Sequence, residues 1–182
     1  NNAVLAVVNL RPDASTKNVA FTLVAGESKQ TLPSDGLRWM DVVYDVNSGQ
    51  PIRSTKRRIL DDQIPNWHNT PGDRVASWAF DERDPKTIYV YPQPSQAKDI
   101  QIVYSVAPQA VNITDFENDT TTISIDDCYF NAIKEYMLYS AYSKDADYAA
   151  NAQRAASHYS IFERALGNKS GVDKAANPEE RM

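Results

Sequence analysis

Residues 126–166 read DDCYFNAIKEYMLYSAYSKDADYAANAQRAASHYSIFERAL, and this stretch decides the fold class. Its second half repeats apolar side chains in alternating steps of four and three residues, which is the spacing of one stripe on an α-helix. The stripe consists of Tyr148, Ala152, Ala155, Tyr159, Phe162 and Leu166. A matching stripe in the first half consists of Phe130, Ile133, Met137 and Ala141. Two such helices joined by a short loop predict an antiparallel helical hairpin.

The hairpin is predicted to occupy residues 124–166. Ser124 is a suitable N-cap for the first helix, and two aspartates follow in the first turn, where the helix dipole favours anions. Gly167, followed by Asn168, predicts the end of the second helix, because glycine readily adopts the conformation that closes helices. We expect the hairpin core to contain Phe130, Ile133, Met137, Tyr148, Tyr159 and Phe162.

Residues 17–110 show the two-residue period of strands and are predicted to form a β-rich domain. The expected strands are residues 19–24, 29–32, 37–46, 75–80, 86–91 and 99–106. Because Gly26 lies between the first two strands, this pair is expected to form a hairpin. A short helix is predicted near residues 56–64, because Ser54 or Thr55 can cap its first turn.

The two ends of the chain have different patterns. Residues 1–12 are typical of the end of an N-terminal helix stopped by an Arg-Pro pair, and we expect most of that helix to precede Asn1. Residues 167–182 contain only two large apolar side chains, Val172 and Met182. Ordering a residue costs about 1–2 kcal/mol, whereas burying two such side chains returns about 3–6 kcal/mol in all. This segment is therefore expected to be an extended tail that a partner orders.

These segments together predict an α+β fold. An antiparallel helical hairpin or bundle is expected, with a β-rich domain inserted between the N-terminal helix and the C-terminal helices, followed by the extended tail. The length of 182 residues is enough to bury a sizeable core. No apolar run approaches the roughly 18 residues that a membrane span needs, so no membrane partner is expected.

The net charge of −5 is concentrated in the last part of the chain. Residues 1–110 carry 12 basic and 12 acidic side chains, whereas residues 111–182 carry 7 and 12. This balance argues against a general nucleic-acid-binding face, which needs a basic surface. Lys56, Arg57 and Arg58 form the one concentrated basic run, which we interpret as a solvated helix face or as a contact to another subunit or to DNA.

Catalytic and nucleotide-binding signatures are absent. The sequence has no glycine-rich phosphate loop, no Gly-x-Ser-x-Gly elbow and no His-Glu-x-x-His pair, so no enzymatic activity is predicted. A single cysteine, Cys128, excludes an internal disulfide, and two histidines leave few metal ligands. The cluster of Asp115, Glu117 and Asp119 lacks the glycine and terminal glutamate of an EF-hand. We therefore expect neither a metal nor a cofactor.

Six segments of the sequence follow one another in an order that is typical of one protein family. They are AVVNLRPDA (6–14), LVAGESKQTLP (23–33), ILDDQIPNW (59–67), FDERDPKTIYVYPQP (80–94), VYSVAP (103–108) and the helical stretch quoted above. In this order they resemble the head-to-tail adaptor family of podophages, including the tail tubular protein A type. The resemblance covers nearly the whole chain, and the family has no catalytic motif to transfer.

The resemblance implies a structural protein of the phage neck that assembles in the host cytoplasm. It implies a dodecameric ring between the portal protein and the tail nozzle or tail-tube proteins, through which double-stranded DNA passes. It also implies that the C-terminal tail docks on the portal. The expected portal contacts are Val172, Asn177, Pro178, Arg181 and Met182, and the expected contacts to neighbouring subunits or DNA are Lys56, Arg57 and Arg58.

The aromatic side chains of the β-rich segment leave an alternative open. Trp39, Trp67, Trp78 and the strand tyrosines have the flat rings that stack on sugars, anchor interfaces or fill cores. The alternative function is a carbohydrate-binding β module or a tail-associated adhesin. It leaves the acidic hairpin and the tail unexplained.

Overall fold

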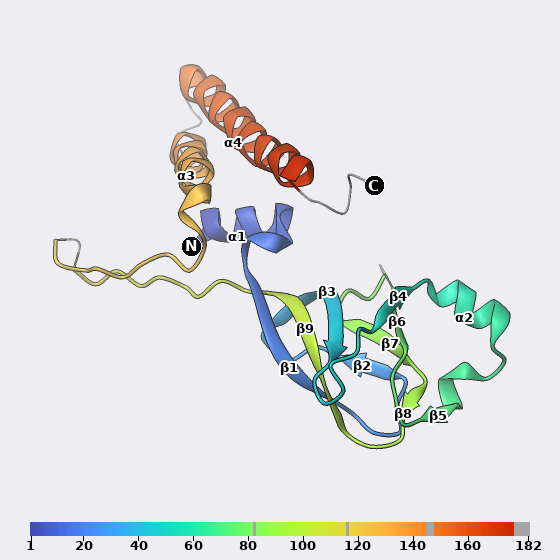
Figure 1. Ribbon diagram of the computed structural model, residues 1–182. Helices are drawn as coiled ribbons and strands as arrows, with labels where there is room; N and C mark the ends of the chain where they lie inside the picture. The colour runs from blue at the N-terminus through green and yellow to red at the C-terminus, as the bar shows by residue number, and fades with distance from the viewer. Residues whose placement is uncertain (82, 116, 145–147, 177–182) are drawn as a thin grey trace. The chain divides into compact units, whose positions relative to one another are not determined.

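The computed structural model describes residues 1–81, 83–115, 117–144 and 148–176. Within these residues the chain has four α-helices and three β-sheets, which confirms the α+β class (Figure 1). The chain forms two compact units. Residues 1–15 and those from 108 onward form the first unit, and residues 16–107 form the second.

The first unit contains three helices. They are α1 (Asn2–Leu10), α3 (Phe130–Lys144) and α4 (Ala149–Ala176). α1 packs against α3, and α3 packs against α4. α1 buries Ala3, Val4, Val7 and Val8, which lie on one face of the helix. It ends at Leu10, immediately before Arg11-Pro12, because proline lacks the amide proton that would continue the helix.

The predicted cap of the first hairpin helix is corrected by the structure. Asp126, and not Ser124, is the N-cap, and its carboxylate accepts a hydrogen bond from the backbone N–H of Cys128 at 2.9 Å. A short 3₁₀ turn, Asp127–Tyr129, then leads into α3. The negative charge of aspartate adds attraction to the helix dipole, which the neutral hydroxyl of serine does not offer.

The prediction that the second helix ends at Leu166 is wrong. α4 continues through Gly167 to Ala176, so residues 167–176 are helical and do not form an extended tail. A glycine in a helix costs only about 1 kcal/mol relative to alanine, and the lysines and alanines that follow are good helix formers. Residues 177–182 of the predicted tail lie outside the described residues.

The second unit is built on two larger sheets and one small sheet. The first sheet has the order β1-β9-β3, in which all pairs are antiparallel. Its strands are β1 (Thr16–Leu23), β9 (Lys98–Val106) and β3 (Gly36–Asp45). The second sheet has the order β2-β7-β6-β4. Its strands are β2 (Lys29–Thr31), β7 (Thr87–Tyr91), β6 (Ser77–Phe80) and β4 (Arg53–Thr55). The small parallel sheet joins β5 (Pro71–Gly72) to β8 (Gln93–Pro94).

β1 and β2 do not form the predicted hairpin. The eight residues of β1 pair with β9, whereas the three residues of β2 pair with β7 in the other sheet. The turn between them is closed by the side chain of Gln30, which donates hydrogen bonds to the carbonyls of Val24 and Glu27 at 3.1 and 2.7 Å. A glycine turn predicts that the chain reverses but not which strands pair. β1 pairs with β9 over eight residues, which is a longer ladder than the three residues of β2 could form.

The two larger sheets share one hydrophobic core. The first sheet contributes chiefly Leu23, Trp39, Val42, Ile100, Ile102 and Tyr104, and the second contributes Trp78, Ile88 and Val90. Alternate residues of β7 point to opposite faces, so Tyr89 and Tyr91 pack instead with Trp67 and with Leu60 of α2 (Arg57–Gln63). α2 therefore covers the outer face of the second sheet.

The predicted caps of the short helix are also corrected. Ser54 and Thr55 do not cap α2, because both lie in β4, where Ser54 is the register partner of Trp78 in β6. Lys56 occupies the N-cap position and makes no side-chain cap hydrogen bond. The sequence pattern does not predict β4, because this three-residue strand has no alternation of apolar and polar side chains.

Candidate interaction surfaces

The packed face of α3 matches the sequence stripe only in part. Phe130 and Met137 on α3, and Tyr148 just before α4, are 63, 61 and 63% exposed, so they do not belong to the core. Tyr159 lies at the boundary, whereas Ile133 and Phe162 are buried. Among the described residues from 124 to 166, the other buried side chains are Ile125, Tyr129, Ala132, Ala155 and Leu166. α3 packs against α1 as well as against α4. The residues that it buries therefore do not form the single stripe that a two-helix hairpin predicts.

Aromatic rings form the contact between α3 and α4. Tyr136 meets Phe162 with ring centroids 5.2 Å apart, and Tyr139 meets Tyr159 at 5.0 Å. The predicted stripe on α3 follows Phe130, Ile133, Met137 and Ala141 and therefore passes over Tyr136 and Tyr139, which lie on a neighbouring face. The aromatic rings of these two tyrosines were the signal that could have located the contact.

A charged hydrogen bond lies beside this aromatic seam. Nδ1 of His158 and Oε2 of Glu135 are 2.7 Å apart, and the ring of His158 stacks on Tyr142. The hydrogen bond from His158 is the main cause that lowers the pKa of Glu135 below its ordinary value, while partial burial opposes it. The pair therefore links the two helices most strongly when Glu135 is ionised.

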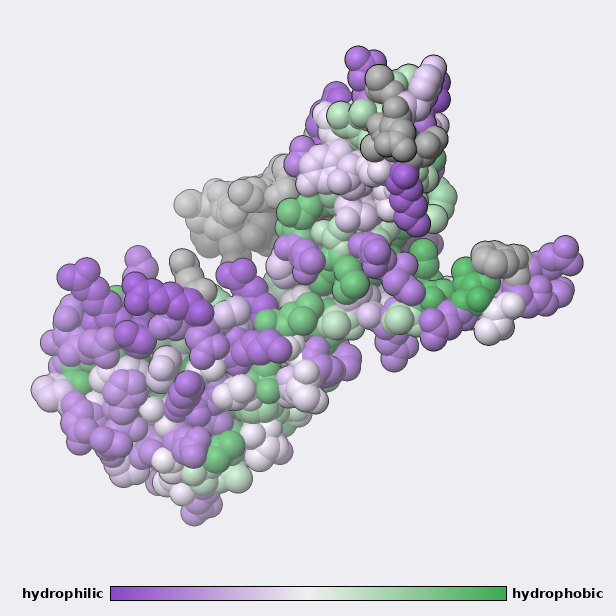
Figure 2. Space-filling view, turned by 180° about the vertical axis from the view of Figure 1, so that it is seen from behind, coloured by the Kyte–Doolittle hydropathy of each residue, from purple (hydrophilic) through white to green (hydrophobic). Residues whose placement is uncertain are grey.

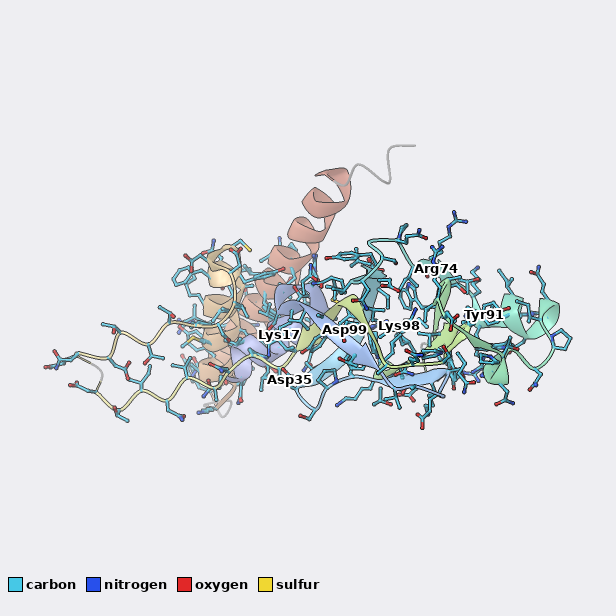
Figure 3. All side chains as sticks on the ribbon, turned by 60° about the horizontal axis from the view of Figure 1, so that its bottom comes forward. Lys17, Asp35, Arg74, Tyr91, Lys98 and Asp99 are labelled. Atoms are coloured by element: carbon cyan, nitrogen blue, oxygen red, sulfur yellow. The ribbon has the colours of Figure 1, made fainter. Side chains whose placement is uncertain are left out.

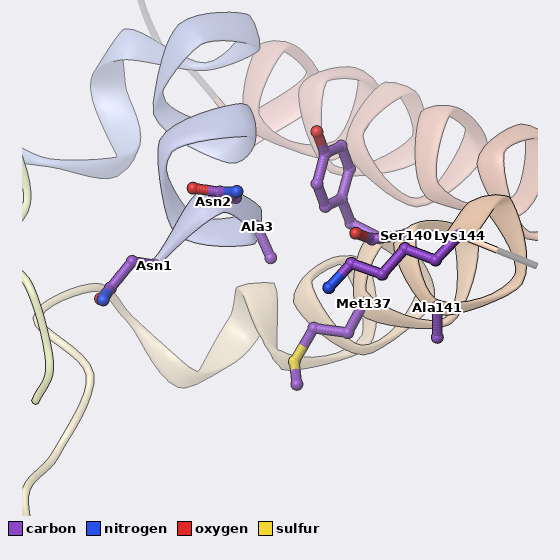
Figure 4. Close-up of a pocket in the computed structure, with 8 residues that line it drawn as sticks. Asn1, Asn2, Ala3, Met137, Ser140, Ala141 and Lys144 are labelled. Atoms are coloured by element: carbon purple, nitrogen blue, oxygen red, sulfur yellow. The ribbon is translucent and has the colours of Figure 1, made fainter. Parts of the chain in front are cut away.

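A pocket of about 430 Å³ opens between the start of α1 and α3 (Figure 4). Its lining consists of Asn1, Asn2, Ala3, Tyr136, Met137, Ser140, Ala141 and Lys144. Lys144 is the only charged residue of the lining, and its side chain reaches along the pocket toward α1 (Figure 4). Sequence analysis did not find this site, because no pattern in the chain places α1 against α3.

The basic run on α2 is partly committed to its own unit. Arg57 contacts Asp81 at 2.9 Å and Asp61 at 3.5 Å, and its guanidinium lies over the ring of Tyr89. The side chain of Arg58 is 91% exposed, and its Nε atom lies 3.7 Å from Oδ2 of Asp62, which is also exposed. These pairs with acids one turn later offset the unfavourable position of cations at a helix start. Lys56 and Arg58 are exposed, and their role as contacts to another subunit or to DNA stays a prediction.

The three tryptophans are core residues. Trp39, Trp67 and Trp78 are each at most 5% exposed. The indole N–H of Trp39 donates to the carbonyl of Lys86, and that of Trp67 donates to Asp61, each at 2.9 Å. A carbohydrate-binding module needs flat rings at the surface, so the burial of these side chains removes the main support for that alternative.

Lys17 and Asp35 form an ion pair within the β-rich unit. Lys17 at the start of β1 lies 2.6 Å from Asp35, and the two side chains meet in Figure 3. The hydrogen bond from Lys17 lowers the pKa of Asp35, while burial raises the pKa of the adjacent Tyr104. This group ties β1 to the segment that precedes β3.

Neither a metal centre nor a membrane span is found in the described part of the chain. No group of three His, Cys, Asp or Glu side chains there could hold a metal ion. Asp115 and Asp119 accept hydrogen bonds from Asn118 and Thr121, which lower the pKa of each carboxyl. None of the described helices is long and apolar enough to cross a membrane.

The family model of the SU10 adaptor protein matches residues 1–182, the whole of this chain. The chain belongs to the SU10 adaptor protein family. It is therefore a phage adaptor, a structural protein of the virion, and its family is not a known class of enzyme. A search among curated proteins gives no significant match. The predicted resemblance is confirmed as far as a phage adaptor, while the podophage type stays a prediction.

The expected portal contacts of this SU10-family adaptor lie at the end of the chain. Val172 falls within α4, whereas Asn177, Pro178, Arg181 and Met182 lie outside the described residues. Among the described residues, three surface features stand out: the exposed side chains of α3, the pocket between α1 and α3, and the exposed cations at the start of α2.

Proposed function

We propose that this protein is a head-to-tail adaptor of a podophage, of the tail tubular protein A type, whose copies form a dodecameric ring between the portal and the tail nozzle. The observation that carries the proposal is the match of the SU10 adaptor family over the full 182 residues. Such a subunit acts by contact with other virion proteins, so its chemistry lies in its surfaces.

Exposed apolar side chains in both units support this proposal. The first unit exposes Leu5, Leu10, Phe130, Met137, Tyr148 and Ile161. The second exposes Val24, Met40, Val43, Tyr44, Val46 and Ile59. Figure 2 shows such hydrophobic surface among the polar residues on one side of the molecule. Exposed apolar patches on a soluble protein commonly mark surfaces that another subunit covers.

The finer arrangement we propose is an antiparallel helical hairpin, with a β-rich domain inserted between the N-terminal helix and the C-terminal helices. Two ring contacts support the hairpin, because the residue number rises from Tyr136 to Tyr139 on α3 while it falls from Phe162 to Tyr159 on α4. Residues 111–182 carry 12 acidic and 7 basic side chains. An acidic wall of this kind suits a channel through which double-stranded DNA passes without binding.

The C-terminal residues are proposed to bind the portal, with Val172, Asn177, Pro178, Arg181 and Met182 as contacts. The test is the deletion of residues 177–182, which lie beyond the end of α4. Purified wild-type protein is expected to add to portal-containing heads, and the deletion variant is expected to stay in solution. A variant with Gln63→Ala serves as the control, because this exposed side chain lies on α2 and belongs to none of the proposed contacts. Equal addition by the deletion variant would remove these residues from the portal contact.

A further inference from the structure

The outer edge of β1 is left open in the β-rich unit. β1 is an edge strand of the β1-β9-β3 sheet and has β9 on one side only (Figure 1). All eight of its residues pair with β9 without a register shift. Because neighbouring residues of a strand direct their backbone N–H and C=O groups to opposite edges, every second residue of β1 points these groups away from β9. Beyond the ladder with β9, no described residue hydrogen-bonds to the backbone of residues 16–23.

This edge lacks the features that usually protect an edge strand from pairing. Lysines, prolines and bulges are the common protections. Residues 18–23, NVAFTL, contain no charge and no proline, and Lys17 at the start of the strand is paired with Asp35. The other edge strand of the sheet, β3, is protected. It has three register shifts against β9, and the backbone groups of Trp39 and Val43 are hydrogen bonded to segments outside the sheet.

The side chain of Val19 is also left uncovered at the outer edge of β1. Val19 lies opposite Ile102 of β9, whose side chain has no exposed surface, so both side chains point to the core face of the sheet. Val19 is nevertheless 37% exposed. A further strand beside β1 would cover this side chain and would pair the open backbone groups at the same time.

Residues 120–124, TTTIS, which we call the threonine segment, have the composition of a strand but form none. They lie in the irregular connection between β9 and α3, in an extended stretch (Figures 1 and 3). Three successive threonines and Ile123 are β-branched, which favours the backbone of a sheet. All five residues are exposed, Ile123 by 44%. In the described part of the chain, the backbone of residues 122–124 has no hydrogen-bond partner.

We propose that the threonine segment of one copy adds to the outer edge of β1 in an adjacent copy and extends the β1-β9-β3 sheet by one strand. Strand addition of this kind takes its affinity from main-chain hydrogen bonds, which both partners lack within one copy. Five extended residues span about 17 Å and the eight residues of β1 about 27 Å, so the segment fits along the edge. Ile123 then points to the core face and covers Val19.

A second copy is the occupant because segment and edge are different parts of one chain. Their contact is head-to-tail, so each copy gives a strand to one neighbour and receives a strand from the other, and such contacts close into a ring. Two β1 edges paired with each other would form a two-fold contact that stops at a dimer. This inference rests on the proposed ring, for which it names a contact between neighbours.

Proline substitutions in the threonine segment test the ladder, because proline has no backbone N–H to donate. Adjacent residues donate to opposite edges, so only one of Thr122→Pro and Ile123→Pro removes a hydrogen bond to β1. That variant should give at least about fivefold fewer rings on portal-containing heads than the alanine variant of the same position, which is the effect of one backbone hydrogen bond. The other proline should match its alanine control. Thermal unfolding of the free chain should be the same in all four variants.

Each other result of the proline test overturns the inference. Equal ring yields for each proline and its alanine control would show that the segment donates no hydrogen bond to a neighbour. An equal loss with both prolines would exclude a one-sided ladder. In either case rings formed by the wild-type protein leave the proposed function intact, whereas a wild-type protein that forms no rings on the portal would overturn the proposed function as well.

Crosslinking identifies the partner strand. All variants carry Cys128→Ser, so that the only thiols are those introduced. One variant adds Ala20→Cys and Thr122→Cys at exposed positions, and the control pairs Thr122→Cys with Ser48→Cys in the exposed turn after β3. Assembled rings are treated with a bismaleimide, whose flexible reach tolerates a shift of register, and separated on a denaturing gel. The proposal predicts a ladder of multimers for the first variant and monomers for the control.

Three other crosslinking results would overturn the proposal. Monomers from the first variant would mean that the threonine segment does not lie beside β1. Crosslinks confined to single chains would mean that the segment pairs with β1 of its own copy. Dimers from a variant with Ala20→Cys alone would mean that two β1 edges pair with each other.

Discussion

Tyr136 of α3 and Phe162 of α4 meet edge to face, with ring centroids 5.2 Å apart. Phe162 has no exposed surface, whereas Phe130, which belongs to the same sequence stripes, is 63% exposed. One phenylalanine thus holds the two helices together, and the other faces outward on α3. Buried side chains such as Phe162 stabilise the subunit, whereas exposed side chains such as Phe130 are available to contact a neighbouring subunit.

The two phenylalanines are expected to differ in their effect on stability. Phe162→Ala should lower the free energy of unfolding by about 3–5 kcal/mol, because it leaves a cavity between the helices. Phe130→Ala should change it by no more than about 0.5 kcal/mol, as exposed substitutions usually do. Urea unfolding of the purified chain measures both, and similar losses in the two variants would refute the assigned helix faces.

Gly167→Ala is expected to stabilise the protein. Gly167 lies inside α4, and a Cβ atom added there meets nothing within 4 Å. Alanine in a helix interior is more favourable than glycine by about 0.5–1 kcal/mol, so thermal unfolding should shift upward. Were the helix to end at this glycine in a left-handed conformation, the same substitution would instead destabilise the chain.

The pair of Glu135 and His158 predicts a loss of stability in acid. The hydrogen bond from His158 lowers the pKa of Glu135 in the folded state, so the contribution of this carboxylate is fully present above its unfolded-state pKa, about 4.3. It is lost as the pH falls through the lower pKa of the folded state. Glu135→Gln should therefore reduce stability at pH 7 and make little difference at the acidic end of this window. Unfolding curves measured from pH 7 to pH 3 check this, and a gap that widens in acid would contradict it.

Neighbouring arginines on α2 are expected to have separate roles. Arg57→Ala should lower the free energy of unfolding by about 1 kcal/mol, because Arg57 contacts Asp81 and Asp61 and lies over Tyr89. Neutralising Lys56 and Arg58 together should leave unfolding unchanged and alter the salt dependence of ring assembly. Assembly that is identical at every salt concentration would show that these two cations are merely solvated.

The sequence predicts the long strands of this protein but not their partners. The alternation of Ile100, Ile102 and Tyr104 places β9 and its buried face correctly, because period and burial are local properties of a strand. Which strands pair depends on contacts between distant parts of the chain. β1 joins β9 across a large sequence separation, and the nearby glycine turn at Gly26 carries no information about that choice.

The helices show the same limit. The structure has α3 and the start of α4 within residues 126–166, yet Phe130 and Met137 of the stripe predicted for α3 are exposed while Ile133 is buried, because α1 also packs on α3. The pocket beside Lys144 combines residues 1–3 with residues 136–144, which lie far apart in the sequence, so no local pattern could have located it. A single glycine does not by itself end a helix, because α4 continues through Gly167 to Ala176.

Electron microscopy of the purified protein, alone and after mixing with its portal, shows whether copies of the chain form a ring. Closed rings seated on the portal are expected, with the adaptor absent from heads that lack a portal. Single copies that never associate with the portal, at any protein concentration tried, would contradict this expectation.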